Sequence, residues 1–106
     1  MELCHAVLIS SFTSPELTHW TLANGVHCVA AEMPDAPLLC LDLWCRAGSA
    51  SEEPGEEGMA HFLEHMVFKG SERLGAGEFD RAIEALGGSS NAATGFDDVH
   101  FHVLIP

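Results

Sequence analysis

The sequence predicts an α+β fold, with a mainly antiparallel sheet and helices packed on one face of it. Three observations favour this class. Segments with strand periodicity lie near both ends of the chain, two segments with helical periodicity lie between them, and an Asn-Gly pair marks a hairpin near the start. A chain of 106 residues makes one domain at most. We expect an N-terminal extension over residues 1–17 and a truncated domain over residues 18–106.

Three strands are expected before the first helix. Those at 18–22 and 26–32 flank Asn24-Gly25, a dipeptide that is favoured in hairpin turns. From 38 to 46 the sequence alternates, and its apolar residues share one face: Leu39, Leu41, Leu43 and Cys45. This alternation predicts a long strand that is packed on one side.

Two helices are expected next. The first follows Glu56 and Glu57, whose negative charge suits a helix N-terminus, and ends near Gly70. Apolar residues cover most of its circumference, as is typical of a buried helix: Met59, Ala60, Phe62, Leu63, Met66, Val67 and Phe68. The second helix spans about 77–86, where apolar side chains recur at helical spacing before two glycines end it.

Two strands complete the predicted order β-β-β-α-α-β-β, one near 90–94 and one from Val99 to Ile105. In the last strand His100 and His102 share a face, because side chains alternate along a strand. Histidines at i and i+2 can chelate a metal ion, but no other residue is expected nearby to complete such a site. We therefore interpret both as partly exposed strand histidines.

The most informative segment is His61-Phe62-Leu63-Glu64-His65 in the first helix. Its spacing places His61, Glu64 and His65 on one helix face. Two imidazoles can bind one zinc ion, and a neighbouring carboxylate can take a proton from a metal-bound water. In a buried helix each unpaired polar group would cost roughly 1–3 kcal/mol, which a metal would relieve. The alternative is that both histidines make ordinary hydrogen bonds.

The residues around this motif resemble the active-site segment of the insulysin, pitrilysin and mitochondrial-processing-peptidase family of zinc metallopeptidases. Its H-x-x-E-H order is called inverzincin, because it reverses the zincin H-E-x-x-H. The resemblance runs from Gly58 to Ser71 and continues in the same order at 83–88 and 91–94, while 22–26 is similar to the family's first hairpin. It therefore covers residues 18–106, as the N-terminal part of such a peptidase domain.

The resemblance implies a zinc-dependent metalloendopeptidase that hydrolyses peptide bonds. His61 and His65 would ligate Zn²⁺, and Glu64 would be the general base that activates the zinc-bound water. The resemblance also implies an edge strand beside the zinc, to which a peptide substrate adds by main-chain hydrogen bonds; its substrate-binding residues would be Asn91, Ala92 and Thr94. A short polar strand without such a role is the alternative.

The family's third zinc ligand is a Glu on a later helix, which we expect beyond Pro106. The isolated chain would then be inactive by itself. The family also encloses its peptide with a second homologous half or subunit, so we expect a homodimer, a heterodimer or a longer chain acting on a peptide or small protein. Two other interpretations stay open: a non-catalytic fragment or subunit, and an H-x-x-E-H metalloenzyme of the S-ribosylhomocysteine lyase type. The downstream blocks disfavour the latter.

Charge and cysteine content narrow the partners and the compartment. Four basic against sixteen acidic residues leave a net charge of −12, which disfavours nucleic acid and membrane surfaces and favours basic peptides. The acidic run at 52–57 is interpreted as a solvated loop, or as an acidic rim near the site. The four cysteines lack C-x-x-C spacing, which favours buried thiols in a reducing compartment. Because no signal segment is recognised, we expect a cytoplasmic protein.

Overall fold

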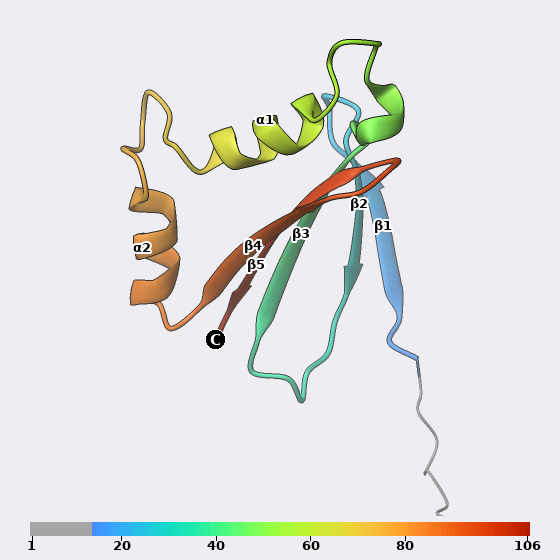
Figure 1. The fold of residues 1–106 in the computed structure, drawn as a ribbon. Helices are drawn as coiled ribbons and strands as arrows, with labels where there is room; N and C mark the ends of the chain where they lie inside the picture. The colour runs from blue at the N-terminus through green and yellow to red at the C-terminus, as the bar shows by residue number, and fades with distance from the viewer. Residues whose placement is uncertain (1–13) are drawn as a thin grey trace, which may run out of the picture. The chain divides into compact units, whose positions relative to one another are not determined.

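The computed structural model describes residues 14–106, which form strands and helices in the order β-β-β-α-α-β-β (Figure 1). Most of the predicted N-terminal extension, residues 1–13, lies outside the described residues. The chain divides into two compact units, Met1–Ala36 and Pro37–Pro106. The helices within residues 14–106 are too short to cross a membrane.

The first unit contains a β-hairpin. Strands β1 (Leu17–Thr21) and β2 (His27–Ala31) pair antiparallel, as the Asn-Gly signal predicts. In the turn, the Gly25 N–H donates to the Leu22 carbonyl at 2.9 Å, and Gly25 has a left-handed φ of 88°. The Asn24 side-chain oxygen accepts the Val26 N–H at 3.2 Å. Glycine is needed at this position because the turn requires a positive φ there.

The second unit contains a three-stranded antiparallel sheet. Its order is β3 (Leu39–Cys45), β5 (Val99–Ile105) and β4 (Ser89–Thr94), so β5 is central and β4 forms one edge. In this register His102 lies opposite Asp42 on one side and opposite Asn91 on the other. The predicted α+β class with an antiparallel sheet is confirmed.

Both helices, α1 (Met59–Val67) and α2 (Glu78–Ala85), pack on the same face of this sheet. The rings of Phe68, just after α1, and Phe101 on β5 lie 6.2 Å apart. From α2, Asp80 accepts a 2.7 Å hydrogen bond from the Ser90 hydroxyl on β4. Residues paired directly across neighbouring strands share a face of the sheet. The β4 residue that pairs with Phe101 lies two positions after Ser90, so Ser90 and Phe101 are on the same face. The prediction that the helices pack on one face is therefore confirmed.

Helix α1 is more exposed than its sequence predicts. Ala60 is its one buried residue, and it lines a narrow apolar space against Val99 of β5. The other apolar side chains of α1 are exposed: Met59, Phe62, Leu63, Met66 and Val67. The prediction of a buried helix is therefore wrong within the described residues. Its main contacts are with β4, β5 and the short 3₁₀ helix η1 (Ser49–Ser51), which leave its outer side uncovered.

The apolar face of β3 is also uncovered. Leu39 and Leu41 are 61% and 66% exposed, although they lie on the same sheet face as the helices. The helices contact β4 and β5, and they leave β3 bare at the other edge of the sheet. Leu43 is 52% exposed as well, and Cys45 is half-buried, so the predicted packing of this strand on one side is wrong for its three leucines.

The thiols are less buried than the sequence predicts. Cys40 is exposed, Cys28 and Cys45 are half-buried, and all three are free. The expectation of buried thiols is therefore wrong for Cys40, which lies on the sheet face opposite α1 and α2. Cys4 lies outside the described residues.

Candidate metal centre

The start of α1 is held by a carboxylate that lies well before it in the sequence. Glu52 accepts the backbone N–H groups of Gly58 and Ala60, both at 2.9 Å. These amides have no partner within the helix, so the carboxylate both satisfies them and complements the helix dipole. The sequence predicts this role for Glu56 and Glu57, but they accept N–H groups of the preceding loop instead. Glu52 was missed because it lies six residues before Gly58.

The two histidines of α1 face each other across one helical turn. Their Nε2 atoms lie 3.0 Å apart, and their ring centroids are 4.6 Å apart. Two nitrogen ligands on one tetrahedral zinc ion, each about 2.0–2.1 Å from it, would lie roughly 3.3 Å apart. The side chains of His61 and His65 are both exposed, so an ion can reach them. The pair therefore fits a shared Zn²⁺ ion with little rearrangement.

Glu64 lies beside this pair and is held by the sheet. Ligand atoms of His61, Glu64 and His65 all lie within 4.8 Å of one another. Glu64 is half-buried, and its Oε2 accepts a short hydrogen bond from the Thr94 hydroxyl on β4. This contact joins α1 to the edge strand and restricts the carboxylate to one orientation. The family resemblance implies a substrate contact for Thr94, and nothing in the sequence predicts its hydrogen bond to Glu64.

Of the predicted substrate-binding residues, Ala92 and Thr94 lie on the sheet face of the helices, whereas Asn91, which pairs with His102, belongs to the opposite face. Ala92 and Thr94 line an open hollow of about 490 Å³ together with His61 and Glu64. Asn91 lines a second open hollow that His65 and Glu64 share with α2. The Asn91 side-chain oxygen accepts the N–H of Ala92, so this side chain is turned toward its own strand. The backbone of β4 thus runs along the whole cluster.

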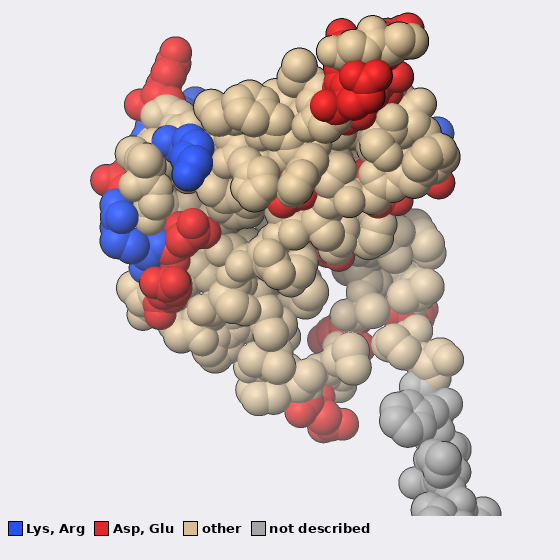
Figure 2. Space-filling view, viewed as in Figure 1, with Lys and Arg blue, Asp and Glu red and all other residues tan. Residues whose placement is uncertain are grey.

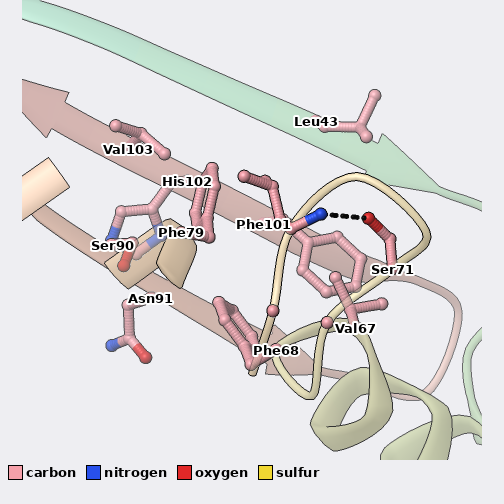
Figure 3. Close-up of a pocket in the computed structure, with 13 residues that line it drawn as sticks. Leu43, Val67, Phe68, Ser71, Phe79, Ser90, Asn91, Phe101, His102 and Val103 are labelled. Atoms are coloured by element: carbon pink, nitrogen blue, oxygen red, sulfur yellow. Dashed lines mark hydrogen bonds between the residues drawn. The ribbon is translucent and has the colours of Figure 1, made fainter. Parts of the chain in front are cut away.

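An apolar pocket of about 300 Å³ lies behind the cluster, between α1, α2 and the sheet (Figure 3). Phe68, Phe79 and Phe101 contribute aromatic rings to it. The loop that closes one side is fixed by a 2.7 Å hydrogen bond from the Ser71 N–H to the Leu74 carbonyl. The pocket is also lined by Asn91 on β4.

Acidic groups lie near the N-terminus of α1. Figure 2 shows acidic side chains over the loop before α1 and around α2, with a broad uncharged surface between them. Within the loop, both carboxylate oxygens of Glu57 accept the Gly55 N–H at 3.1 Å. This hydrogen bond lowers the pKa of Glu57 from its ordinary value of 4.5. The Glu57 carboxylate therefore keeps its negative charge to a lower pH than a glutamate without this hydrogen bond.

A second group of metal-ligating side chains lies on the sheet itself. Ligand atoms of Asp42, His100 and His102 all lie within 4.8 Å of one another. The expectation that no residue completes a site beside the two strand histidines is therefore wrong. The sequence shows the two histidines on one strand face. It does not show that Asp42, which lies in another strand, is paired beside them, because it does not give the register.

Comparisons with known proteins agree with these observations. A family model described as Insulinase (Peptidase family M16) matches residues 28–106. The zinc protease PqqE of Helicobacter pylori is 38% identical over 84 residues, which are 78% of this chain and 19% of that protein. A probable mitochondrial-processing peptidase subunit beta of Arabidopsis thaliana is 33% identical over 104 residues, which are 95% of this chain and 20% of that protein.

The solved structures include a similar fold. The crystal structure of a protease from Helicobacter pylori aligns with a TM-score of 0.83 at 35% identity, covering 88% of this chain and 23% of that one. This chain spans about a fifth of the length of the curated relatives that it matches.

Proposed function

We propose that this chain, which belongs to the insulinase family of peptidases (peptidase family M16), supplies the zinc-binding segment of a metalloendopeptidase. The observation that carries the proposal is the pair of imidazoles on α1, whose Nε2 atoms face each other at 3.0 Å beside a fixed carboxylate. The family members that it matches include named zinc proteases. Because the chain spans about a fifth of those relatives, the activity of the whole protein is part of the proposal.

His61 and His65 would hold the zinc ion, and Glu64 would act as the general base. When bound, Zn²⁺ lowers the pKa of a coordinated water and polarises the carbonyl of the peptide. Glu64 would accept a proton from the attacking water and would pass it to the leaving amine. The Thr94 hydroxyl keeps the carboxylate turned toward the histidines during this transfer. This assignment uses Glu64 as a base, so a further carboxylate from outside residues 14–106 would be the third zinc ligand.

A peptide substrate would bind along β4. This strand is an edge of the sheet, its outer side is free of a neighbouring strand within the described residues, and it runs past Glu64. An extended peptide can add to such an edge by main-chain hydrogen bonds. The net charge of −12 would favour basic peptides by long-range attraction.

A second homologous half or subunit would cover the exposed apolar surfaces of α1 and β3. Five apolar side chains of α1 are exposed, and so are Leu39 and Leu41. Large exposed apolar surfaces typically mark interaction sites. A relative that is named as a subunit is consistent with a heteromeric partner.

The test replaces Glu64 by Gln in the complete gene product. The variant should keep its zinc, measured by atomic absorption, because both imidazoles remain. Its kcat for cleavage of an unstructured basic peptide should fall by about 10²- to 10⁴-fold, the usual contribution of a general base. Glu53→Gln is the matched control, since this carboxylate lies exposed in the loop before α1. Undiminished cleavage by the Glu64 variant would remove the general-base assignment.

The alternative is a non-catalytic subunit of the same family. It is favoured by the number of ligands: with Glu64 assigned as the base, only His61 and His65 remain in this cluster to hold the ion, and both are exposed. In that case the wild-type gene product would bind zinc weakly and show no cleavage that Glu64→Gln could reduce. Zinc content and cleavage of the wild-type protein therefore separate the two functions.

A further inference from the structure

We propose that Asp42, His100 and His102 form a second binding site for a divalent transition-metal ion, separate from the α1 histidines. The site would bridge β3 and β5. Side chains alternate along β5, so His100 and His102 face away from Phe101, which contacts the helical side. The proposed site therefore lies on the sheet face opposite α1 and α2, and it does not depend on the peptidase function.

The strand register brings the three side chains together. Asp42 lies directly opposite His102 in the antiparallel pair, and His100 is two residues further along the same face. Side chains directly opposite each other have Cβ atoms about 4.5–5.5 Å apart, so one ion can reach both. The arrangement is therefore fixed by backbone pairing and needs no loop movement.

The distances between the ligand atoms suit one ion. The three ligand atoms lie within 4.8 Å of one another, and His100 Nδ1 lies 3.2 Å from Asp42 Oδ1. Nitrogen and oxygen ligands on one tetrahedral zinc ion, each about 2.0–2.2 Å from it, would lie roughly 3.3 Å apart. The His100–Asp42 pair already has this separation, and the ligand atom of His102 lies within 4.8 Å of both.

The surroundings of the site hold the imidazoles in place. Trp44 stacks on His100 with a centroid distance of 4.4 Å and an angle of 12° between the rings. The rings of His100 and His102 are also nearly parallel, 5.8 Å apart. The side chains of His100 and Asp42 are 23% and 34% exposed, so they are partly shielded yet open to an ion. Restricting the rings before binding reduces the entropy lost on binding.

The chemistry of the donors selects the class of ion. Two imidazoles and one carboxylate suit Zn²⁺, Cu²⁺, Ni²⁺ or Fe²⁺, whereas Ca²⁺ and Mg²⁺ prefer oxygen ligands. A bound ion would tie β3 to β5 and stabilise the pairing of these strands, because it binds the folded sheet alone. The competing explanation is a simple hydrogen bond between His100 and Asp42, in which His102 has no part. A substitution of His102 therefore distinguishes the metal site from the simple hydrogen bond.

The main experiment measures Zn²⁺ binding calorimetrically in the complete gene product, with the first centre removed by His61→Ala and His65→Ala. One equivalent should still bind. Adding His102→Gln should weaken this binding by at least about 100-fold, since even a residue that only orients a ligand is worth about 10- to 100-fold. His19→Gln is the matched control, because His19 is an exposed strand histidine of β1, outside the cluster. Equal affinity in the His102 and His19 variants would overturn the proposal.

A second measurement leaves all three ligands intact, and so it does not depend on whether the His102 variant folds. The Trp44 signal is taken as the difference in fluorescence between the same background, with His61→Ala and His65→Ala, and its Trp44→Phe version, so that any other tryptophan of the complete gene product cancels. One equivalent of Cu²⁺ should quench the Trp44 fluorescence, because the indole stacks on His100. Ca²⁺ at the same concentration should leave the fluorescence unchanged. Fluorescence that stays constant through one equivalent of Cu²⁺ would exclude the site.

Discussion

The two clusters of metal-ligating side chains in this chain are assembled in different ways. His61, Glu64 and His65 belong to one helix, so the helical repeat alone sets their separation. Asp42 and His100 are 58 positions apart in the sequence, and the register of β3 against β5 brings them together. The helix cluster therefore keeps its ligand geometry wherever α1 forms, whereas the strand cluster exists only while the sheet is intact.

The clusters also differ in what surrounds them. The two imidazoles of α1 are exposed, and Glu64 is tied to β4 by Thr94. In the strand cluster, His100 is held between Trp44 and Asp42 and is largely covered. An open cluster beside an edge strand suits a reaction with a bound peptide. A partly shielded cluster that spans two strands suits a role in stabilising the sheet.

The largest effect is expected from a mutation that disturbs the sheet, because only the strand cluster depends on the sheet. Gly48 follows β3, and a Cβ placed there would lie 2.3 Å from the Phe96 carbonyl oxygen and 2.5 Å from the Asp98 nitrogen. Gly48→Ala should therefore push the end of β3 away from the start of β5 and lower the free energy of unfolding by about 1–3 kcal/mol. Chemical denaturation measures this loss. Metal affinity should fall at the strand cluster and stay unchanged at His61 and His65.

Gly95→Ala is the matched control for this prediction. It lies in the β4–β5 turn, and the nearest atoms to its added Cβ are those of Asp98 at an ordinary 3.4 Å. This variant should keep both the unfolding free energy and the metal affinities. If Gly48→Ala weakened both clusters equally, the helix cluster would also depend on the sheet, and the contrast between the clusters would be lost.

A smaller effect is expected at the contact that joins the helix cluster to the sheet. Thr94→Val keeps the shape of the side chain and removes the hydroxyl that donates to Glu64. A hydrogen bond to a charged group is worth about 1.5–3 kcal/mol, so kcat should fall roughly ten-fold or more in the complete gene product. KM and zinc content should stay the same, because neither histidine is touched. Thr94→Ser should restore kcat, and its failure to do so would contradict a positioning role for the hydroxyl.

The same contrast explains how much of the molecule could be predicted from the sequence. The helix cluster could be predicted because its three residues lie close together in the sequence. The last strand, Val99–Ile105, also has the predicted bounds. The family resemblance is confirmed as well. Asp42 could not be assigned to His102, because a period of two residues identifies faces within a strand but not the register between strands.

The failure to predict burial has a related cause. The circumference of α1 was correctly identified as apolar, but the sequence of a helix does not reveal which elements cover it. Ala60 is buried because β5 lies beneath it, whereas Phe62 points away from the sheet and is exposed. Glu52 at the start of α1 was missed for a similar reason, since the bend of the loop places it there.

The smallest expected effect is the pH dependence of a hydrogen bond in the loop before α1. The strand cluster has no corresponding loop contact within the described residues. The Gly55 N–H donates to Glu57 and lowers the pKa of that carboxyl below 4.5. Because the pKa is depressed in the folded state, the contact is complete above 4.5 and is lost as the pH falls through the lowered folded value. An NMR titration should show the Glu57 carboxyl and the Gly55 amide changing together, below 4.5. In Glu57→Gln the Gly55 amide should stop titrating, while the resonances of His100 and His102 stay unchanged. A Gly55 amide that still titrates in this variant would assign the shift to another carboxylate of the loop.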